Sequence, residues 1–168
     1  TDGQAGTADR ELSPAALIQR RAAEQRAAAD FMGVRHVEML GYPDGELEDT
    51  RAFLGDVVRA IRRHRPHTVF VHDPYRMQGF QHRDHRKAGI VATDAVYPYA
   101  RDHLHFAEHI TGEGLEPQAL DRTLRREERE EGCVQCGVFL RRRLVPRALV
   151  QCCGHSSRPG GRNRVHGD

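Results

Sequence analysis

The chain has 168 residues, and its 26 basic and 24 acidic side chains leave a formal net charge of +2. This length is typical of a single domain of ordinary size, and the near balance of charge excludes a protein that binds polyanions over its whole surface. The longest apolar runs, residues 69–71 and 88–92, are far shorter than the ~20 residues of a membrane span. No basic start leads into an apolar stretch of the kind that directs secretion, so we expect a cytoplasmic protein.

The first predicted elements are a helix and a short strand. Ser13 and Pro14 indicate a helix start, because a serine hydroxyl accepts a bond from an orphan backbone N–H and proline already has the φ of the first helical position. The alanine-rich residues 14–32 continue this helix up to Gly33, a residue typical of the position just after a helix. Residues 34–40 then alternate apolar and polar side chains, which predicts a strand.

The next segments continue the alternation of helices and strands. Residues 50–63 place apolar side chains on one helical face, and Pro66 ends that helix. Residues 68–72 form an almost wholly apolar run, typical of a strand that is covered on both faces. A third helix is predicted over residues 84–97. The order predicts a doubly wound, Rossmann-like α/β fold: an incomplete, mostly parallel sheet between two helical layers, with its site at the carboxyl ends of the strands.

The composition changes near residue 118. Residues 121–131 are a dense run of alternating charges, and the segment from Gly132 onward is rich in arginine and contains all four cysteines of the chain. Such a segment cannot bury enough apolar area to offset the loss of chain entropy. We therefore expect a partial α/β domain over residues 1–118 and a disordered tail over residues 119–168.

The tail permits two interpretations. Cys133, Cys136, Cys152 and His155 have the spacing C-x2-C-x15-C-x2-H, which is within the range of structural zinc sites. With the surrounding arginines, that pattern would suit a zinc ribbon that binds nucleic acid. Out-of-frame translation of a GC-rich gene would also produce runs of Arg, Gly, Pro and Cys without hydrophobic period. We favour this second interpretation, and do not expect nucleic acid as the partner.

The strongest chemical motif is His82-Arg83-Asp84-His85. Two histidines three residues apart at a helix start lie on one face, and the carboxylate between them can hold one imidazole in a fixed tautomer. His72 and Asp73, at the end of a predicted buried strand, lie within reach of this motif. The alternative is a polar helix terminus rich in capping groups. The position after a core strand favours a functional site.

Several segments together resemble the PIG-L/LmbE family of zinc-dependent N-deacetylases, which remove acetyl groups from N-acetylglucosaminyl and related small molecules. They include a glycine turn, an Arg-x-x-Glu helix, an acidic turn after a strand and the His-x-Asp-His signature. The matching segments, in the order of the family, are residues 1–6, 21–24, 40–45, 82–89, 95–106 and 114–117. The resemblance covers about residues 1–118.

The resemblance implies a role for five side chains. His85 would be a ligand to Zn²⁺. His82 would stabilise the oxyanion or protonate the leaving amine, and Asp84 would orient it. Arg21 and Asp44 resemble positions that face the sugar. This assignment is chemically consistent, because zinc polarises an amide carbonyl and lowers the pKa of water, while a histidine can support the oxyanion. The expected substrate is a small N-acetyl amino-sugar conjugate.

The sequence also departs from the family pattern. The other two zinc ligands and the general base of the family lie in a His-Pro-Asp-Asp segment, which we expect upstream of Thr1. Since a catalytic zinc takes about three protein ligands, this chain would supply only one of them. A catalytically inactive fragment is therefore an alternative to an active deacetylase, and assembly into a homo-oligomer stays open.

Overall fold

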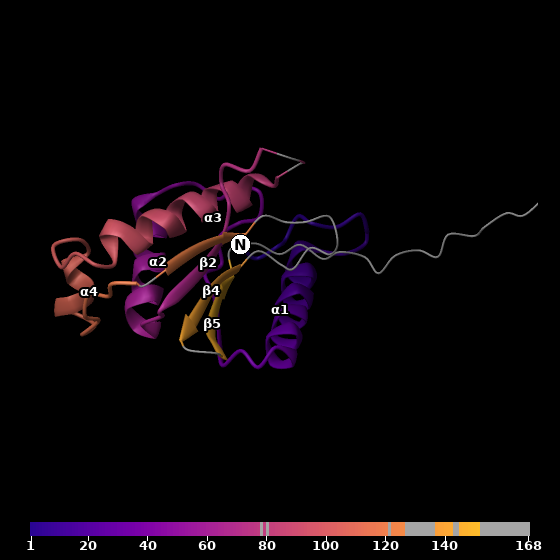
Figure 1. The fold of residues 1–168 in the computed structure, drawn as a ribbon. Coiled ribbons are helices and arrows are strands. Elements are labelled where there is room, and N and C mark those ends of the chain that lie inside the picture. Colours follow the sequence, from indigo (N-terminus) through magenta and orange to yellow (C-terminus); the bar gives the residue numbers. More distant parts are fainter. Residues whose placement is uncertain (78, 80, 121, 127–136, 143–144, 152–168) are drawn as a thin grey trace, which may run out of the picture.

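The first helix begins and ends as the sequence predicts. In the computed structural model (Figure 1), α1 (Pro14–Phe31) follows Ser13, whose Oγ accepts a hydrogen bond from the backbone N–H of Ala16 at 3.3 Å. Proline occupies the first helical turn. The chain leaves the helix through Gly33 with a φ of +68°, a conformation that costs glycine little. The structure describes residues 1–77, 79, 81–120, 122–126, 137–142 and 145–151, with side chains described up to residue 120.

Two strands and the helix between them form the central unit. β1 (His36–Met39) leads through a loop to α2 (Arg51–His64), and β2 (Thr68–His72) follows. α2 begins at Thr50, whose Oγ1 accepts from the backbone N–H of Phe53 at 3.2 Å. One face of α2 is apolar and buried, as expected. The side chains of that face are Phe53, Leu54, Val57, Val58, Ala60 and Ile61.

The third helix packs against α2 and β2 and completes the hydrophobic core. α3 (Arg83–Asp94) continues directly into a π-helical segment, η1 (Ala95–Tyr99), and α4 (Ala107–Thr111) is a short helix further along. The buried apolar side chains of α3 (Ala88, Val91 and Ala92) join those of α2 and β2 in one hydrophobic cluster. Figure 1 shows α1 on one side of the sheet and α2 and α3 on the other, so the strands lie between two helical layers.

The sheet is mixed, which corrects the prediction of a mostly parallel, doubly wound sheet. Its order is β1-β5-β4-β2-β3, where β3 is Arg122–Arg126, β4 is Gly137–Arg142 and β5 is Val145–Gln151. β1 pairs with β5 and β2 with β3 in parallel, whereas β4 pairs antiparallel with both of its neighbours. The reason is that β4 and β5 follow each other after a short connection, which makes them antiparallel. This pair separates β1 from β2.

Three of the five strands lie beyond residue 118. Because they share one sheet with β1 and β2, the composition change near residue 118 does not coincide with the end of the sheet. The division into a domain and a tail stays a prediction for the rest of residues 119–168. The four residues proposed for a zinc ribbon, Cys133, Cys136, Cys152 and His155, lie outside the described residues.

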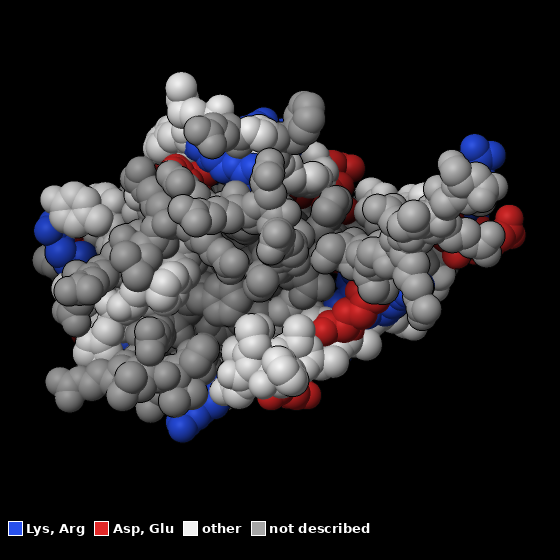
Figure 2. Space-filling view, turned by 45° about the vertical axis from the view of Figure 1, so that its right-hand side comes forward, with Lys and Arg blue, Asp and Glu red and all other residues white. Residues whose placement is uncertain are grey.

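Two properties of the described residues concern membrane spans and surface charge. None of the helices in the described part of the chain is long and apolar enough to cross a membrane. On the face in Figure 2, the described Lys and Arg side chains stand in small groups that alternate with Asp and Glu. This distribution agrees with the nearly balanced charge of the sequence.

A buried arginine of α2 binds the backbone at the end of η1 and in the segment that follows it. Arg62, near the end of α2, is only 1% exposed. Burial lowers the pKa of its guanidinium, and backbone carbonyl dipoles surround the charge instead of a carboxylate. The guanidinium donates hydrogen bonds of 2.8–3.3 Å to the carbonyl oxygens of Tyr99, Ala100, Asp102, His105 and Phe106. All three nitrogen atoms of the guanidinium thus donate to one segment of the backbone.

Replacing Arg62 by methionine should destabilise the protein strongly. The variant Arg62→Met leaves buried carbonyl groups without donors, and we expect the free energy of unfolding to fall by about 3 kcal/mol or more. The neighbouring Arg63→Met is the control, because Arg63 is 44% exposed and an exposed ion pair contributes about 1 kcal/mol at most. Urea unfolding measures both. Equal losses in the two variants would contradict the role given to Arg62.

Candidate functional site

The site is built around a buried carboxylate in the first turn of α3. Asp84 has no exposed surface. One carboxylate oxygen accepts a hydrogen bond from the backbone N–H of Gly45 at 2.8 Å, and the other accepts from that of Leu47 at 3.3 Å. The loop after β1 is thereby fixed to the start of α3. The acidic turn and the His-x-Asp-His signature, which are far apart in the sequence, are therefore in direct contact.

Arg83 strengthens the same contact from the outside. Its guanidinium donates to the carbonyl oxygens of Leu47 at 2.7 Å and Gly45 at 3.3 Å, and it pairs with the carboxylate of Glu48. The loop therefore offers its N–H groups to Asp84 and its carbonyl groups to Arg83. Because two adjacent residues of α3 hold both kinds of backbone group, the loop has one defined position relative to the helix.

His82 caps α3 and stands beside the buried carboxylate. Its Nδ1 accepts a hydrogen bond from the backbone N–H of Asp84 at 3.2 Å. In the neutral ring, an acceptor at Nδ1 leaves the proton on Nε2. The carboxylate oxygen of Asp84 lies 4.0 Å from Nδ1, beyond hydrogen-bond distance. The backbone of Asp84 thus holds this imidazole, whereas its carboxylate holds the loop; an orienting role of the carboxylate stays a prediction.

Three imidazoles gather at the carboxyl end of β2, and we call His72, His82 and His85 the histidine cluster. His85 is only 5% exposed. Its ring stacks on that of His72 with centroids 4.4 Å apart and planes inclined by 23°, and the His82 ring lies 5.4 Å away. The sequence places His82 and His85 together through their spacing. The contact with His72 depends on how α3 packs on β2.

One group of side chains could hold a metal ion among the described residues. Asp44, His82 and Asp84 each present a ligand atom, and these atoms all lie within 4.8 Å of one another. Asp44 is buried, and its carboxylate accepts from the hydroxyl of Thr1 at 3.4 Å. Imidazole nitrogen and carboxylate oxygen are donors that zinc accepts. His85, the ligand that the resemblance implies, is beside this group and not part of it.

Arg21 lies in a different part of the structure. It is 7% exposed and donates to the carbonyl oxygen of Gly6 at 3.0 Å and to Glu24 at 2.7 Å. Its Nε is buried and has no hydrogen-bond partner among the described residues. The side chain lines a cavity of about 410 Å³ together with the glycine turn. No described contact joins Arg21 to the histidine cluster, so its role toward a substrate stays a prediction.

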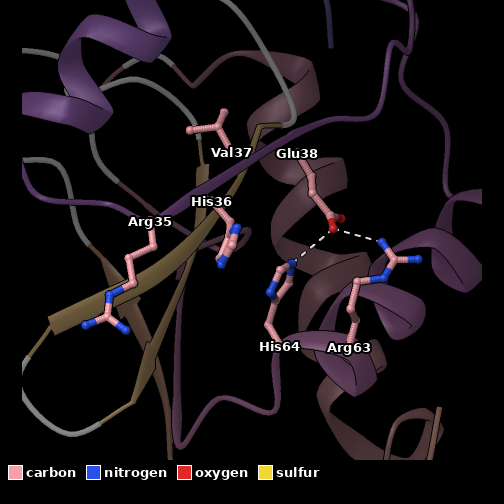
Figure 3. Close-up of a pocket in the computed structure, with 6 residues that line it drawn as sticks. All are labelled: Arg35, His36, Val37, Glu38, Arg63 and His64. Atoms are coloured by element: carbon pink, nitrogen blue, oxygen red, sulfur yellow. Dashed lines mark hydrogen bonds and ion pairs between the residues drawn. The ribbon is translucent and has the colours of Figure 1, made fainter.

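A second polar pocket, of about 700 Å³, lies at the start of β1 and the end of α2. In Figure 3, Glu38 points to His64 and Arg63, with an oxygen 3.0 Å from His64 Nε2 and 2.8 Å from the Arg63 guanidinium. His36 stacks on His64 at 5.6 Å. The hydrogen bond from His64 and the nearby charge of Arg63 lower the pKa of Glu38 to about 2. These contacts explain the pocket as a structural ion-pair cluster.

Comparisons with known proteins agree with the signature at the start of α3. Residues 1–96 match the family model PIG-L, described as GlcNAc-PI de-N-acetylase. The chain belongs to the PIG-L family. This match contains the loop after β1 and the whole His-x-Asp-His signature, whereas the strands β3, β4 and β5 lie outside it.

Two deacetylases are similar to this PIG-L chain. Diacetylchitobiose deacetylase of Thermococcus kodakarensis is 38% identical over 96 residues, which are 57% of this chain and 36% of that protein. The structure of N,N'-diacetylchitobiose deacetylase from Pyrococcus horikoshii, complexed with its inhibitor MPG, matches with a TM-score of 0.63 and 32% identity. That match covers 69% of this chain and 42% of the other. The matched part of the chain thus spans less than half the length of either relative.

Removing the charge of Asp84 should loosen the contact between α3 and the loop. In Asp84→Asn, one oxygen acceptor becomes an N–H₂ group that faces a backbone N–H, so we expect a loss of about 1–3 kcal/mol in the free energy of unfolding. The control is Glu48→Gln, which changes an exposed partner of Arg83 and should cost well under 1 kcal/mol, as exposed pairs do. Denaturant unfolding compares them. An unchanged stability in Asp84→Asn would contradict this account.

Glu38 should make stability depend on acidity. Its pKa is about 2 in the folded protein against an ordinary value of 4.5, so its stabilising contribution is complete above pH 4.5 and is lost as the pH falls toward 2. Glu38→Gln removes this titration. The unfolding free energy of the variant should therefore fall less steeply than that of the unchanged protein between those pH values. Parallel curves would show that the ion pairs of Glu38 contribute nothing.

Proposed function

We propose that this PIG-L chain belongs to a zinc-dependent N-deacetylase that acts on N-acetylglucosaminyl-type small molecules. In this proposal the chain contributes one zinc ligand, one catalytic histidine and the residues that bind the sugar. The observation that carries this proposal is the arrangement at the start of α3, where the buried Asp84 holds Asp44 and His82 within 4.8 Å of each other beside His85. The two similar deacetylases, named for diacetylchitobiose, supply the first candidate substrate.

The reaction is the hydrolysis of an amide. The oxygen of water bonds to the acetyl carbon, the C–N bond breaks, and the nitrogen leaves as an amine after it takes up a proton. The products are acetate and the free amino sugar. The chemistry that zinc supplies when bound is polarisation of the amide carbonyl and acidification of a water molecule. His85 would hold the ion, and the nitrogen and oxygen donors around it are of the kinds that zinc binds.

His82 is the residue that we assign to the reacting atoms. Since its Nδ1 accepts from the backbone of Asp84, the neutral ring carries its proton on Nε2 and can donate to the oxyanion as negative charge develops there. The same proton can pass to the leaving nitrogen. The side chain is 31% exposed, whereas Asp84 is fully buried. A substrate can therefore reach His82, while Asp84 acts from behind as the support.

The sugar-binding roles rest on two further side chains. Asp44 lies next to His82 and carries a carboxylate that can accept hydrogen bonds from sugar hydroxyls. Arg21 offers a buried Nε without a partner among the described residues, and the resemblance to the family implies that it faces the sugar. Binding groups of this kind act equally on substrate and transition state, so their loss raises KM more than it lowers kcat.

Variants of the two histidines of the signature test the proposal. In the polypeptide that carries these residues, we measure zinc content and the release of acetate from diacetylchitobiose. His85→Ala should lose both metal and activity. His82→Ala should keep the metal and lose about 100- to 1000-fold in kcat, as expected for one oxyanion stabiliser. Arg21→Ala should mainly raise KM.

The control for these variants is His36→Ala, because His36 also stacks on a second histidine but belongs to the pocket of Figure 3. It should retain both zinc and activity. If His82→Ala removes the zinc while His85→Ala retains it, the two roles are reversed. If the unchanged polypeptide binds zinc and releases no acetate from any N-acetyl amino sugar, the proposed reaction is wrong.

A further inference from the structure

We propose that His72 is a positioning residue, which fixes the imidazole plane of His85 by stacking on it, and that Gly89 makes this stacking geometry accessible. The inference rests on the proposed function for its consequence, since the His85 ring matters as the expected zinc ligand. The stacking and the packing contact belong to the described residues themselves. Neither His72 nor Gly89 has a role in the proposed reaction itself.

The two rings come from different elements. His72 is the last residue of β2, and His85 lies in the first turn of α3. Their centroids are 4.4 Å apart and their planes are inclined by 23°, a distance and orientation typical of stacked aromatic rings. The terminal torsion of a histidine side chain has a broad, roughly two-fold profile. A ring that lies against the face of His85 narrows this range.

Gly89 explains why the rings can approach so closely. It lies one helical turn after His85 on the same face of α3. A Cβ atom at this position would lie 2.3 Å from the carbonyl oxygen of His72 and 3.1 Å from Cδ of Pro74. The first contact is with backbone, which cannot rotate away as a flexible side chain can. Only a residue without a Cβ lets α3 lie this close to the end of β2.

Stacking is a suitable way to orient an imidazole that binds a metal ion. A stacked neighbour uses the face of the imidazole, whereas metal binding and proton transfer use the nitrogen atoms at its edge. Removing the hydrogen-bonding partners that orient a metal-binding histidine typically weakens metal affinity or activity by about 10- to 100-fold, and we expect a stacked ring that orients the same histidine to act in the same sense. Through this ring contact, His72 can therefore determine the direction in which the His85 nitrogens point.

Two substitutions of His72 separate the ring face from the ring nitrogens. His72→Phe keeps an aromatic face, and His72→Ala removes it. We follow the imidazole ¹H–¹³C resonance of His85, which senses the ring current of a stacked neighbour, together with zinc affinity by calorimetry. His72→Phe should retain a shifted, single His85 resonance and the zinc affinity. His72→Ala should lose the shift and weaken zinc binding by about tenfold or more.

Gly89→Ala provides an independent test, because it leaves both histidines in place and pushes α3 away from β2. We expect the His85 resonance to change as in His72→Ala. His36→Ala is the matched control, since it removes the other stacked histidine pair and should leave the His85 resonance and the zinc affinity unchanged. Thermal unfolding of each variant confirms that the readout comes from folded protein.

The outcomes separate this inference from the proposed function. If His72→Ala leaves the His85 resonance unchanged, or if His72→Phe behaves like His72→Ala, the ring face of His72 does not position His85. If the unchanged polypeptide binds no zinc, the proposed function fails, whereas the resonances of His85 still decide whether His72 and Gly89 set its orientation. If zinc binds, and His72→Ala and Gly89→Ala weaken its binding while His72→Phe and His36→Ala do not, both statements are supported.

Discussion

The arrangement of the site depends on one buried carboxylate. Burial of Asp84 removes a charge from water, which is costly unless hydrogen bonds compensate. Two backbone N–H groups of the loop after β1 provide that compensation, and the amino-terminal end of α3 adds a favourable dipole. Because these donors are rigid parts of the main chain, the ionised side chain determines where the loop and the helix meet. Asp44 comes from the loop, and His82 and His85 come from the helix, so one anion sets the relative positions of all three.

Much of the local structure could be predicted from the sequence. The starts of α1 and α2 follow from Ser13 and Thr50, whose hydroxyl groups bind the first free backbone N–H groups of each helix. The strand β2 and the helix after it were expected for similar local reasons. The proximity of His82 to His85 was also expected, because residues three apart on a helix share a face. These features depend on neighbours within a few positions of the chain.

The remaining features depend on contacts between distant segments. Asp84 accepts hydrogen bonds from residues that precede it by 37 and 39 positions, and no periodic pattern in the sequence predicts such a contact. The stacking of His72 on His85 requires the close approach at Gly89, a residue that the sequence presents only as a glycine within a helix. The antiparallel β4 was missed because the charged and arginine-rich composition beyond residue 118 gave no strand period. Composition argued against order there, whereas hydrogen bonding to β2 and β5 places these residues in the sheet.

The arginine at the end of α2 has a consequence for how the molecule opens. Since a single guanidinium binds five carbonyl groups between Tyr99 and Phe106, that segment cannot detach in steps without leaving a buried cation partly unsolvated. Breaking only some of these hydrogen bonds therefore costs more free energy per bond than releasing the whole segment from Arg62. Local unfolding free energies follow such contiguous units. The last turn of α2 and the segment from Tyr99 to Phe106 should accordingly exchange their amide hydrogens as one cooperative unit, although more than thirty residues of chain separate them.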